Sequence, residues 1–242
     1  ALATAAFGAG AAGGGWTDFN RYPRFVADVN GDSFGDLVGF GEVGTYVAFG
    51  TGTGGFGALT LATTAFGAGP AGGSWTSYDR YPRRPADVNG DGRDDLVGFG
   101  ENGTYVALAN PGGQGGFGGL TLGTAAFGAG PGAGTWSSFN LYPRRLGDVN
   151  GDSRADIVGF GENGTYVALG EFDAPGQFQA FKLGIANFGS GAAGGGWTSY
   201  ERYPRELSEI AADVNGDRIE DIVGFGENGT YVALGTFSGN FI

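Results

Sequence analysis

The sequence predicts an all-β repeat protein, and three observations favour this fold class. Tryptophan recurs at intervals of 59, 61 and 61 residues. Each Trp is followed by a Tyr-Pro-Arg, an Asp-rich loop and short apolar segments in the same order. No stretch shows the 3.6-residue apolar period of an amphipathic helix, so we expect almost no helix. A fixed period of this kind is typical of repeat architectures. The four tryptophans are Trp16, Trp75, Trp136 and Trp197.

Each repeat contains four short segments rich in Val, Ile, Thr, Phe and Tyr, which predict strands separated by Gly, Asn and Pro. The segments that follow the Asp-rich loop in the second repeat are residues 95–100 and 103–108. Between them, Asn102-Gly103 is a strong hairpin signal, because both positions tolerate positive φ. A segment such as 59–66 closes the unit. Tandem four-stranded antiparallel units of this size are typical of β-propeller blades.

The repeats predict one propeller domain over residues 1–242. Their approximate bounds are 8–66, 67–127, 128–188 and 189–242, with an N-terminal strand at 1–7. Joined end to start, the two termini rebuild one repeat's fourth strand. We therefore expect the N-terminal strand to pair with the C-terminal blade and to leave no open edge. A homo-oligomer that exchanges strands and contains more blades is the alternative.

Composition excludes several function classes. The net charge of −12 disfavours nucleic acid and anionic membranes as partners. The chain contains no Cys and no His. Disulfides, zinc sites built from Cys or His, and catalysis by serine–histidine or cysteine–histidine pairs are therefore excluded. No apolar run is long enough for membrane insertion, and no signal peptide is visible.

An acidic loop recurs in every repeat with the pattern Asp-x-Asn-Gly-Asp-x-x-x-Asp. Positions 1, 3 and 5 bring side-chain oxygens together around a tight Gly turn, and Ca²⁺ prefers six to eight oxygen ligands. Position 7 is variable and offers only its backbone carbonyl, while position 9 is always Asp. We predict about one structural Ca²⁺ per repeat. The candidate ligands are Asp28, Asn30, Asp32, Phe34 and Asp36; Asp87, Asn89, Asp91, Arg93 and Asp95; Asp148, Asn150, Asp152, Arg154 and Asp156; and Asp213, Asn215, Asp217, Ile219 and Asp221.

Two other interpretations of this loop were weighed. An EF-hand requires Glu at position 12, but the second loop has Gly98 there. Asp, Asn and Gly are also ordinary turn residues, and one loop alone would allow that interpretation. Four copies with the same polar positions favour the metal.

The acidic loop, followed by an apolar-Val-Gly-Phe-Gly segment, resembles the FG-GAP/VCBS repeats of integrin-α-type propellers over essentially the whole chain. The added Trp and Tyr-Pro-Arg elements resemble the lectin family typified by the Psathyrella velutina lectin. That resemblance implies a calcium-containing propeller that binds N-acetylglucosamine-type sugars in pockets between neighbouring blades. Members have six or seven blades, whereas this sequence has four repeats.

The residues themselves suggest where a sugar would bind. Each Trp lies in a Gly-rich loop, and an aromatic face takes the flat side of a ligand. An Arg after Pro offers a planar donor fork, and Glu and Asn lie at a predicted hairpin tip. The candidates are Trp16, Trp75, Trp136 and Trp197; Arg24, Arg83, Arg144 and Arg205; Glu42, Glu101, Glu162 and Glu227; and Asn102, Asn163 and Asn228. The first repeat has Val43 in place of Asn, so we expect a weaker site there.

Structural roles remain open for each group. Trp would pack between blades, Arg would pair with the acidic loops, and Asn-Gly would be a plain turn. Asn-Gly-Thr also matches the glycosylation sequon. The strand tyrosines are candidates for either core or pocket wall; they are Tyr46, Tyr105, Tyr166 and Tyr231.

The sequence thus predicts a non-enzymatic, calcium-stabilised, multivalent lectin or agglutinin that acts on glycans outside the cell. Near-identical sites on one molecule gain strength by avidity. A calcium-dependent, integrin-like adhesion module that binds protein partners is the second hypothesis. A hydrolase with paired carboxylates is the third, and four equal copies of every acid disfavour it.

Overall fold

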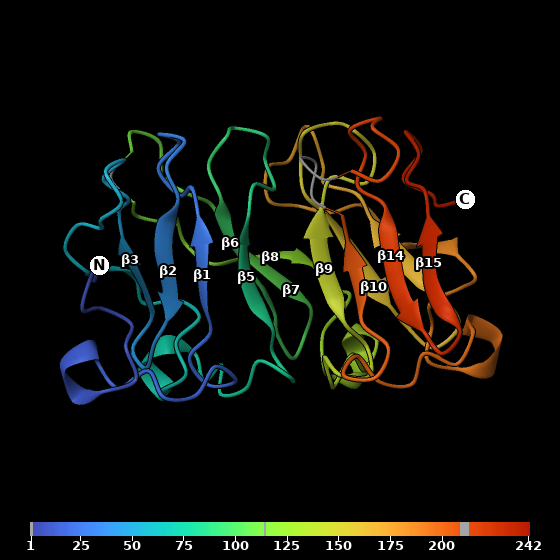
Figure 1. The fold of residues 1–242 in the computed structure, drawn as a ribbon, viewed down its shortest axis with the longest axis horizontal. Coiled ribbons are helices and arrows are strands. Elements are labelled where there is room, and N and C mark those ends of the chain that lie inside the picture. The colour runs from blue at the N-terminus through green and yellow to red at the C-terminus, as the bar shows by residue number, and fades with distance from the viewer. Residues whose placement is uncertain (1, 114, 209–212) are drawn as a thin grey trace. The chain divides into compact units, whose positions relative to one another are not determined.

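The computed structural model describes residues 2–113, 115–208 and 213–242, and it confirms the all-β prediction (Figure 1). Helical structure in the described residues is confined to 3₁₀ turns, each within a Gly-rich Trp loop. These turns are η1 (Ala11–Gly13), η2 (Pro70–Gly72), η3 (Pro131–Ala133) and η4 (Ala192–Gly194). In this described part of the chain, no helix has the length and apolar character needed to cross a bilayer.

The chain divides into two compact units. The first unit comprises residues 1–87, 91–100 and 104–122. Its first antiparallel sheet has the order β1-β2-β3-β4, and β5-β6-β7-β8 form the next sheet along the chain. The strands are β1 (Arg24–Ala27), β2 (Asp36–Phe40), β3 (Thr45–Ala48), β4 (Thr60–Thr63), β5 (Arg83–Ala86), β6 (Asp95–Phe99), β7 (Thr104–Ala107) and β8 (Thr121–Thr124).

The second unit comprises residues 88–90, 101–103 and 123–242. It contains the sheet β9-β10-β11-β12 and a three-stranded sheet β13-β14-β15. The prediction that residues 1–242 form one domain stays a prediction. The strands are β9 (Arg144–Gly147), β10 (Asp156–Phe160), β11 (Thr165–Ala168), β12 (Lys182–Ile185), β13 (Arg205–Leu207), β14 (Ile222–Gly226) and β15 (Gly229–Ala233).

The last sheet lacks a fourth strand among the described residues. Tyr231 and Val232 of β15 are 42% and 45% exposed, whereas Val167, the β11 counterpart of Val232, is fully buried. In the other three sheets the fourth strand lies beside this position. Residues 2–7 form no strand. Closure by the N-terminal strand therefore stays a prediction.

The predicted hairpin between the second and third strands is confirmed, but its turn differs from the prediction. Phe160 pairs with Thr165, so four residues connect β10 and β11. Gly164 has a φ of 150°, and Asn163 is not among the residues with positive φ. The amide of Gly161 donates to the carbonyl of Gly164 at 2.8 Å. The Asn therefore occupies the tip of a wider turn and needs no left-handed backbone.

Glycines in the second strand make room for the Trp loop. A Cβ on Gly159 of β10 would lie 2.7 Å from the rings of both Phe127 and Trp136. Gly98 and Gly224 have the same relation to their Phe and Trp. Val158 and Phe160, which flank Gly159 and so lie on the other face of the strand, are fully buried in a hydrophobic core cluster. The Val-Gly-Phe-Gly segment thus positions the indole directly on the sheet.

Candidate functional site

The four tryptophans are mostly buried, with exposed fractions of 5–8%. Trp136 meets Tyr142 and Tyr166 edge-on, with ring centroids 5.9 and 6.2 Å apart, and Phe127 at 5.1 Å. Trp75 repeats this pattern with Tyr81 and Tyr105 at 6.0 and 6.1 Å. Edge-to-face aromatic contacts stabilise such clusters beyond the area they bury. Each Trp therefore packs against the strands of its own repeat.

Three of these tryptophans also line hollows of the same design. Their volumes are about 310 Å³ at Trp16, 600 Å³ at Trp136 and 240 Å³ at Trp197. Each hollow contains the Tyr of Tyr-Pro-Arg, the Gly-Glu pair of the hairpin and the Tyr of the third strand. The shared sets are Trp16, Tyr22, Gly41, Glu42 and Tyr46; Trp136, Tyr142, Gly161, Glu162 and Tyr166; and Trp197, Tyr203, Gly226, Glu227 and Tyr231.

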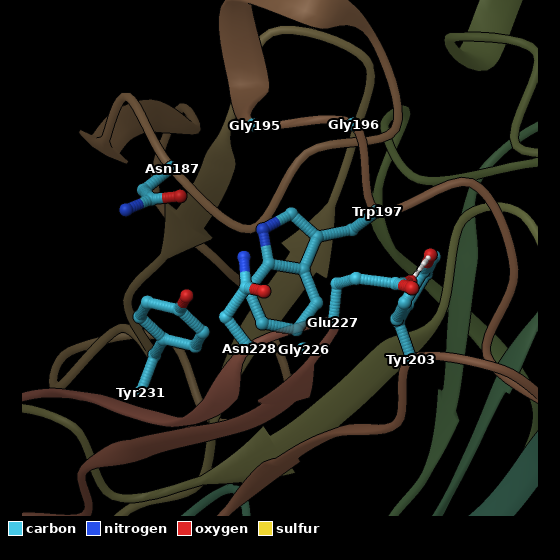
Figure 2. A pocket seen from close by; sticks show the side chains of 9 residues that line it. All are labelled: Asn187, Gly195, Gly196, Trp197, Tyr203, Gly226, Glu227, Asn228 and Tyr231. Atoms are coloured by element: carbon cyan, nitrogen blue, oxygen red, sulfur yellow. Dashed lines mark hydrogen bonds between the residues drawn. The ribbon is translucent and has the colours of Figure 1, made fainter.

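Each shared set comes from one repeat, whereas the sequence analysis expected pockets between blades. The reason is that the Trp loop folds back onto the sheet that follows it. Figure 2 shows the Trp197 indole with Tyr231 on one side and the hydrogen-bonded pair of Glu227 and Tyr203 on the other. Asn228 and Asn163, from the hairpins, also line their hollows. Of the residues around the Trp197 hollow, Asn187 belongs to the preceding repeat.

The hairpin Glu is paired with an Arg in two of the hollows. Arg21 Nη2 lies 2.9 Å from Glu42 Oε2, and the Tyr22 hydroxyl donates to the same oxygen at 2.9 Å. The Tyr22 hydroxyl, followed by Arg21, lowers the pKa of Glu42. Arg202 and Tyr203 hold Glu227 in the same way, at 2.8 and 2.5 Å. These carboxylates are thus charged and already neutralised by the protein.

The Trp136 hollow lacks this pair. Its equivalent residue is Leu141, and the carboxylate of Glu162 has no hydrogen bond or ion pair to any residue that the structure describes. Phe181, which is 51% exposed, adds an aromatic wall where the Trp16 hollow has Leu59. Glu101 and Asn102, the counterparts in the second repeat, lie in the second unit, where the Glu101 carbonyl accepts the Gly130 amide at 2.8 Å.

The arginines of Tyr-Pro-Arg do not line the hollows, which corrects the sequence prediction. Arg83, Arg144 and Arg205 are fully buried. Arg144 Nη1 donates to the Trp136 and Phe127 carbonyls at 2.8 and 3.3 Å. Arg24 Nη1 likewise donates to the carbonyls of Trp16 at 2.6 Å and Phe7 at 3.0 Å. These arginines hold the Trp loop from beneath.

Burial of these guanidinium groups is costly. It lowers the pKa of Arg83 to about 9 and the pKa of Arg205 to about 10, because desolvation disfavours the charged form. The carbonyl acceptors offset part of this cost.

The acidic loops fold as networks of backbone hydrogen bonds. Asp28 accepts the amides of Gly31 and Ser33, each at 2.7 Å, and Asp32 accepts that of Phe34 at 2.8 Å. These Asx turns explain why the loop requires Asp and Asn at alternate positions. At position 7, Arg93 and Arg154 turn their side chains onto Asp91 and Asp152 of their own loops. Phe34 and Ile219 cannot do so.

The Asp at position 9 joins the loop to the sheet. Asp36 is fully buried and accepts the amides of Val29 at 3.1 Å and Gly50 at 2.8 Å. Burial raises its pKa, and Asp32 and Asp28 add a smaller effect in the same direction. Asp156 is bound in the same way to Val149 and Gly170, and burial raises its pKa well above the ordinary value. Both oxygens of this Asp are thus already engaged.

Metal binding was predicted for these loops. The donor chemistry suits a hard cation, since the shared positions of each loop supply three carboxylates and one amide oxygen. In the described residues, however, no group of three or more acidic side chains has the arrangement of a formed metal site. The calcium site stays a prediction.

Comparisons with known proteins identify the repeat. Residues 87–159 match the family model of the FG-GAP-like repeat. This part of the chain resembles an FG-GAP-like repeat. No curated protein matches it significantly.

A lectin of known structure is similar to the whole chain. The chain aligns over 100% of its length with an Agrocybe aegerita lectin, at a TM-score of 0.84 and 35% identity. Its published description is specific recognition of non-reducing terminal N-acetylglucosamine. The chain spans 55% of that lectin, so about half its length. The predicted resemblance to FG-GAP repeats and to a lectin of this type is confirmed.

A second solved structure shares only the fold. The Tc holotoxin pore of Photorhabdus luminescens matches 86% of this chain and 9% of its own, at a TM-score of 0.57 and 17% identity.

Several residues at the hollows are absent from the sequence prediction. Arg21 and Arg202 stand one residue before the Tyr of Tyr-Pro-Arg, whereas the predicted donor is the Arg one residue after the Pro. An Arg recurs at this position in three repeats, but the third repeat has Leu141, which breaks the pattern. Phe181 was missed because its counterpart in the first repeat is Leu59.

Proposed function

We propose that this chain is a multivalent, non-enzymatic lectin that binds glycans ending in N-acetylglucosamine-type sugars at the Trp hollows. The observation that carries the proposal is the full-length likeness, at 35% identity, to a lectin described as recognising that terminal sugar. The hollows add independent support. Each combines aromatic walls with carboxylate, amide and phenol groups, which is the usual composition of a small-ligand site.

In the proposed pocket, aromatic side chains pack against the sugar and amide side chains form hydrogen bonds with it. Tyr46, Tyr166 and Tyr231 offer partly exposed ring faces, on which the apolar face of a sugar packs. Asn163 and Asn228 offer both donors and acceptors for hydroxyl and acetamido groups. A monosaccharide buries little area, so we expect single-site dissociation constants of roughly 0.1–1 mM. Several sites on one molecule would strengthen binding to a glycan-coated surface.

The test is agglutination of cells and binding to an array of defined glycans, each competed by free N-acetylglucosamine. The double variant Asn163→Ala with Asn228→Ala should reduce both signals, since it removes amides from two hollows. Gln179→Ala is the matched control, because Gln179 is exposed and lines none of the three hollows. Binding to protein ligands that the sugar does not compete would favour the adhesion module instead, and would overturn the lectin proposal.

We also propose that Ca²⁺ stabilises the four acidic loops. Three carboxylates within nine residues repel one another, and a divalent cation would relieve that repulsion. Asp28, Asn30 and Asp32 and their counterparts would hold the ion, while Asp36 and its counterparts attach the loop to the sheet. The ion would supply structural stabilisation only.

Closure and cellular location complete the proposal. Residues 1–7 repeat the sequence of a fourth strand, and β15 has an exposed edge. We propose that they pair, either within one chain or by exchange between two copies. Glycan binding of this kind would take place outside the cell.

A further inference from the structure

The Trp136 hollow differs from the Trp16 and Trp197 hollows in the position that sets its charge. In those two, the Arg guanidinium lies over the ring of the adjacent Tyr, 5.4 Å from the centroid of Tyr22 and 5.0 Å from that of Tyr203. The same guanidinium pairs with the hairpin Glu. The protein thus supplies its own cation between a carboxylate and an aromatic face. Leu141 stands at this position in the third repeat.

The Trp136 hollow retains the groups that hold a cation. Glu162 and Tyr142 both line it, and neither the Glu162 carboxylate nor the Tyr142 hydroxyl has a hydrogen-bond partner among the residues the structure describes. The remaining wall is aromatic: Trp136 meets Tyr166 at 6.2 Å, and Tyr166 meets Phe181 at 5.8 Å. An unpaired carboxylate beside several aromatic rings favours a bound cation.

The size of this hollow also leaves room for a ligand. Its volume of about 600 Å³ compares with 310 Å³ at Trp16 and 240 Å³ at Trp197. Leu141 cannot pair with Glu162, so a cation that pairs with this carboxylate has to come from outside the pocket.

We propose that the Trp136 hollow binds an amino sugar through its protonated amine, in preference to the N-acetylated form. The ammonium group lies between Glu162 and the ring of Tyr142, where Arg21 and Arg202 place their guanidinium in the other hollows. The sugar part of this inference rests on the proposed lectin function. The cationic part rests on Glu162, Leu141 and the aromatic wall.

The test is titration calorimetry of the full chain at low ionic strength and pH 6, where exposed charges are weakly screened. The probes are D-glucosamine, N-acetylglucosamine and tetramethylammonium. We expect one glucosamine site per chain, and tetramethylammonium should compete for it. Glu162→Gln should weaken glucosamine binding roughly fivefold or more, the factor that about 1 kcal/mol represents.

A reciprocal exchange provides the sharper comparison. Leu141→Arg should abolish the glucosamine site, because the guanidinium would take the place of the ammonium. Arg202→Leu should create a second glucosamine site at Trp197, since it frees Glu227. The Arg202 side chain is 65% exposed, so its removal should not disturb folding.

The outcomes separate this inference from the lectin proposal. If N-acetylglucosamine binds but glucosamine does not, or if glucosamine binding is unchanged in Glu162→Gln and Leu141→Arg, the cation site is wrong and the lectin stands. If tetramethylammonium binds and Leu141→Arg removes it, while neither sugar binds, the cation site stands and the lectin proposal fails. If no probe binds, both are wrong.

Discussion

At the scale of single residues, Trp136 both packs in the protein interior and lines a candidate binding hollow. It is 8% exposed and packs on Gly159, Tyr142 and Tyr166, yet it also lines a hollow. Because so little of the indole is exposed, it offers a ligand only a small contact area. Tyr166 and Asn163 at the rim of the hollow are therefore better probes of binding, and Trp136 is a better probe of stability.

We predict that Trp136→Ala lowers the free energy of unfolding by about 3–5 kcal/mol, because it leaves a cavity in a packed aromatic cluster. Urea unfolding followed by circular dichroism would measure this loss. Asn163→Ala is the control and should leave the unfolding midpoint within about 0.5 kcal/mol of the wild type, since Asn163 is exposed. A Trp136→Ala protein of unchanged stability would show that the indole does not support the loop.

The repeat pattern also determined which residues of the site could be predicted from the sequence. The Trp and Glu that line the hollows recur in phase, so the sequence could single them out as candidates. Arg144 was misplaced because its neighbours in sequence suggested a donor to ligand. In the sheet it pairs with Gly159, and Phe127 and Trp136 pack over that glycine. Cross-strand neighbours share a face, so its guanidinium lies beneath the loop. This depends on strand register, which the repeat pattern alone did not reveal.

At the scale of elements, each Trp loop depends on glycine in the second strand beneath it. Gly159 of β10 is the clearest case, with two rings 2.7 Å from the place of a Cβ. A Cβ on Gly132 of η3, by contrast, would have no neighbouring atom within 4 Å. Strand and loop therefore form one packing unit.

We predict that Gly159→Ala destabilises the protein by about 1–3 kcal/mol, because the added methyl group forces the rings to move. It should also shift the near-ultraviolet circular dichroism of the Trp cluster. Gly132→Ala, the matched control, should change neither signal. Equal effects of the two variants on the unfolding midpoint would contradict this account.

The acidic loops give a prediction about metal removal. Chelation should lower the melting temperature, because a cation that binds only the folded state stabilises it by mass action. Calorimetry with excess chelator, and then with added Ca²⁺, would measure the shift. Arg154→Ala should enlarge the shift, since it frees Asp152 from an ion pair of 2.9 Å. Identical melting curves with and without chelator would argue against calcium.

At the scale of the whole molecule, the number of repeats was evident from the sequence, but the closure of the sheets was not. The repeat count follows from four Trp and four acidic loops. Closure depends on contacts between distant segments, which periodicity does not encode. The exposed Tyr231 and Val232 on β15 mark the edge where a partner strand is expected.

We predict that deletion of residues 1–7 leaves this edge open and causes aggregation or association into larger species. Light scattering after size-exclusion chromatography would detect them, with the full chain as the reference. A truncated protein that remains monomeric and equally stable would mean that another segment, or none, covers β15.

Because the shared residues of each hollow come from one repeat, the repeat is also a unit on which evolution can act. Duplication of a single repeat carries nearly a whole site with it, so sites can be added without inventing new ones. A change at one copy, such as the difference between Leu141 and the Arg of the other repeats, then alters one site and leaves the other copies as they are. A chain of this kind can accumulate different sugar preferences on one inherited scaffold.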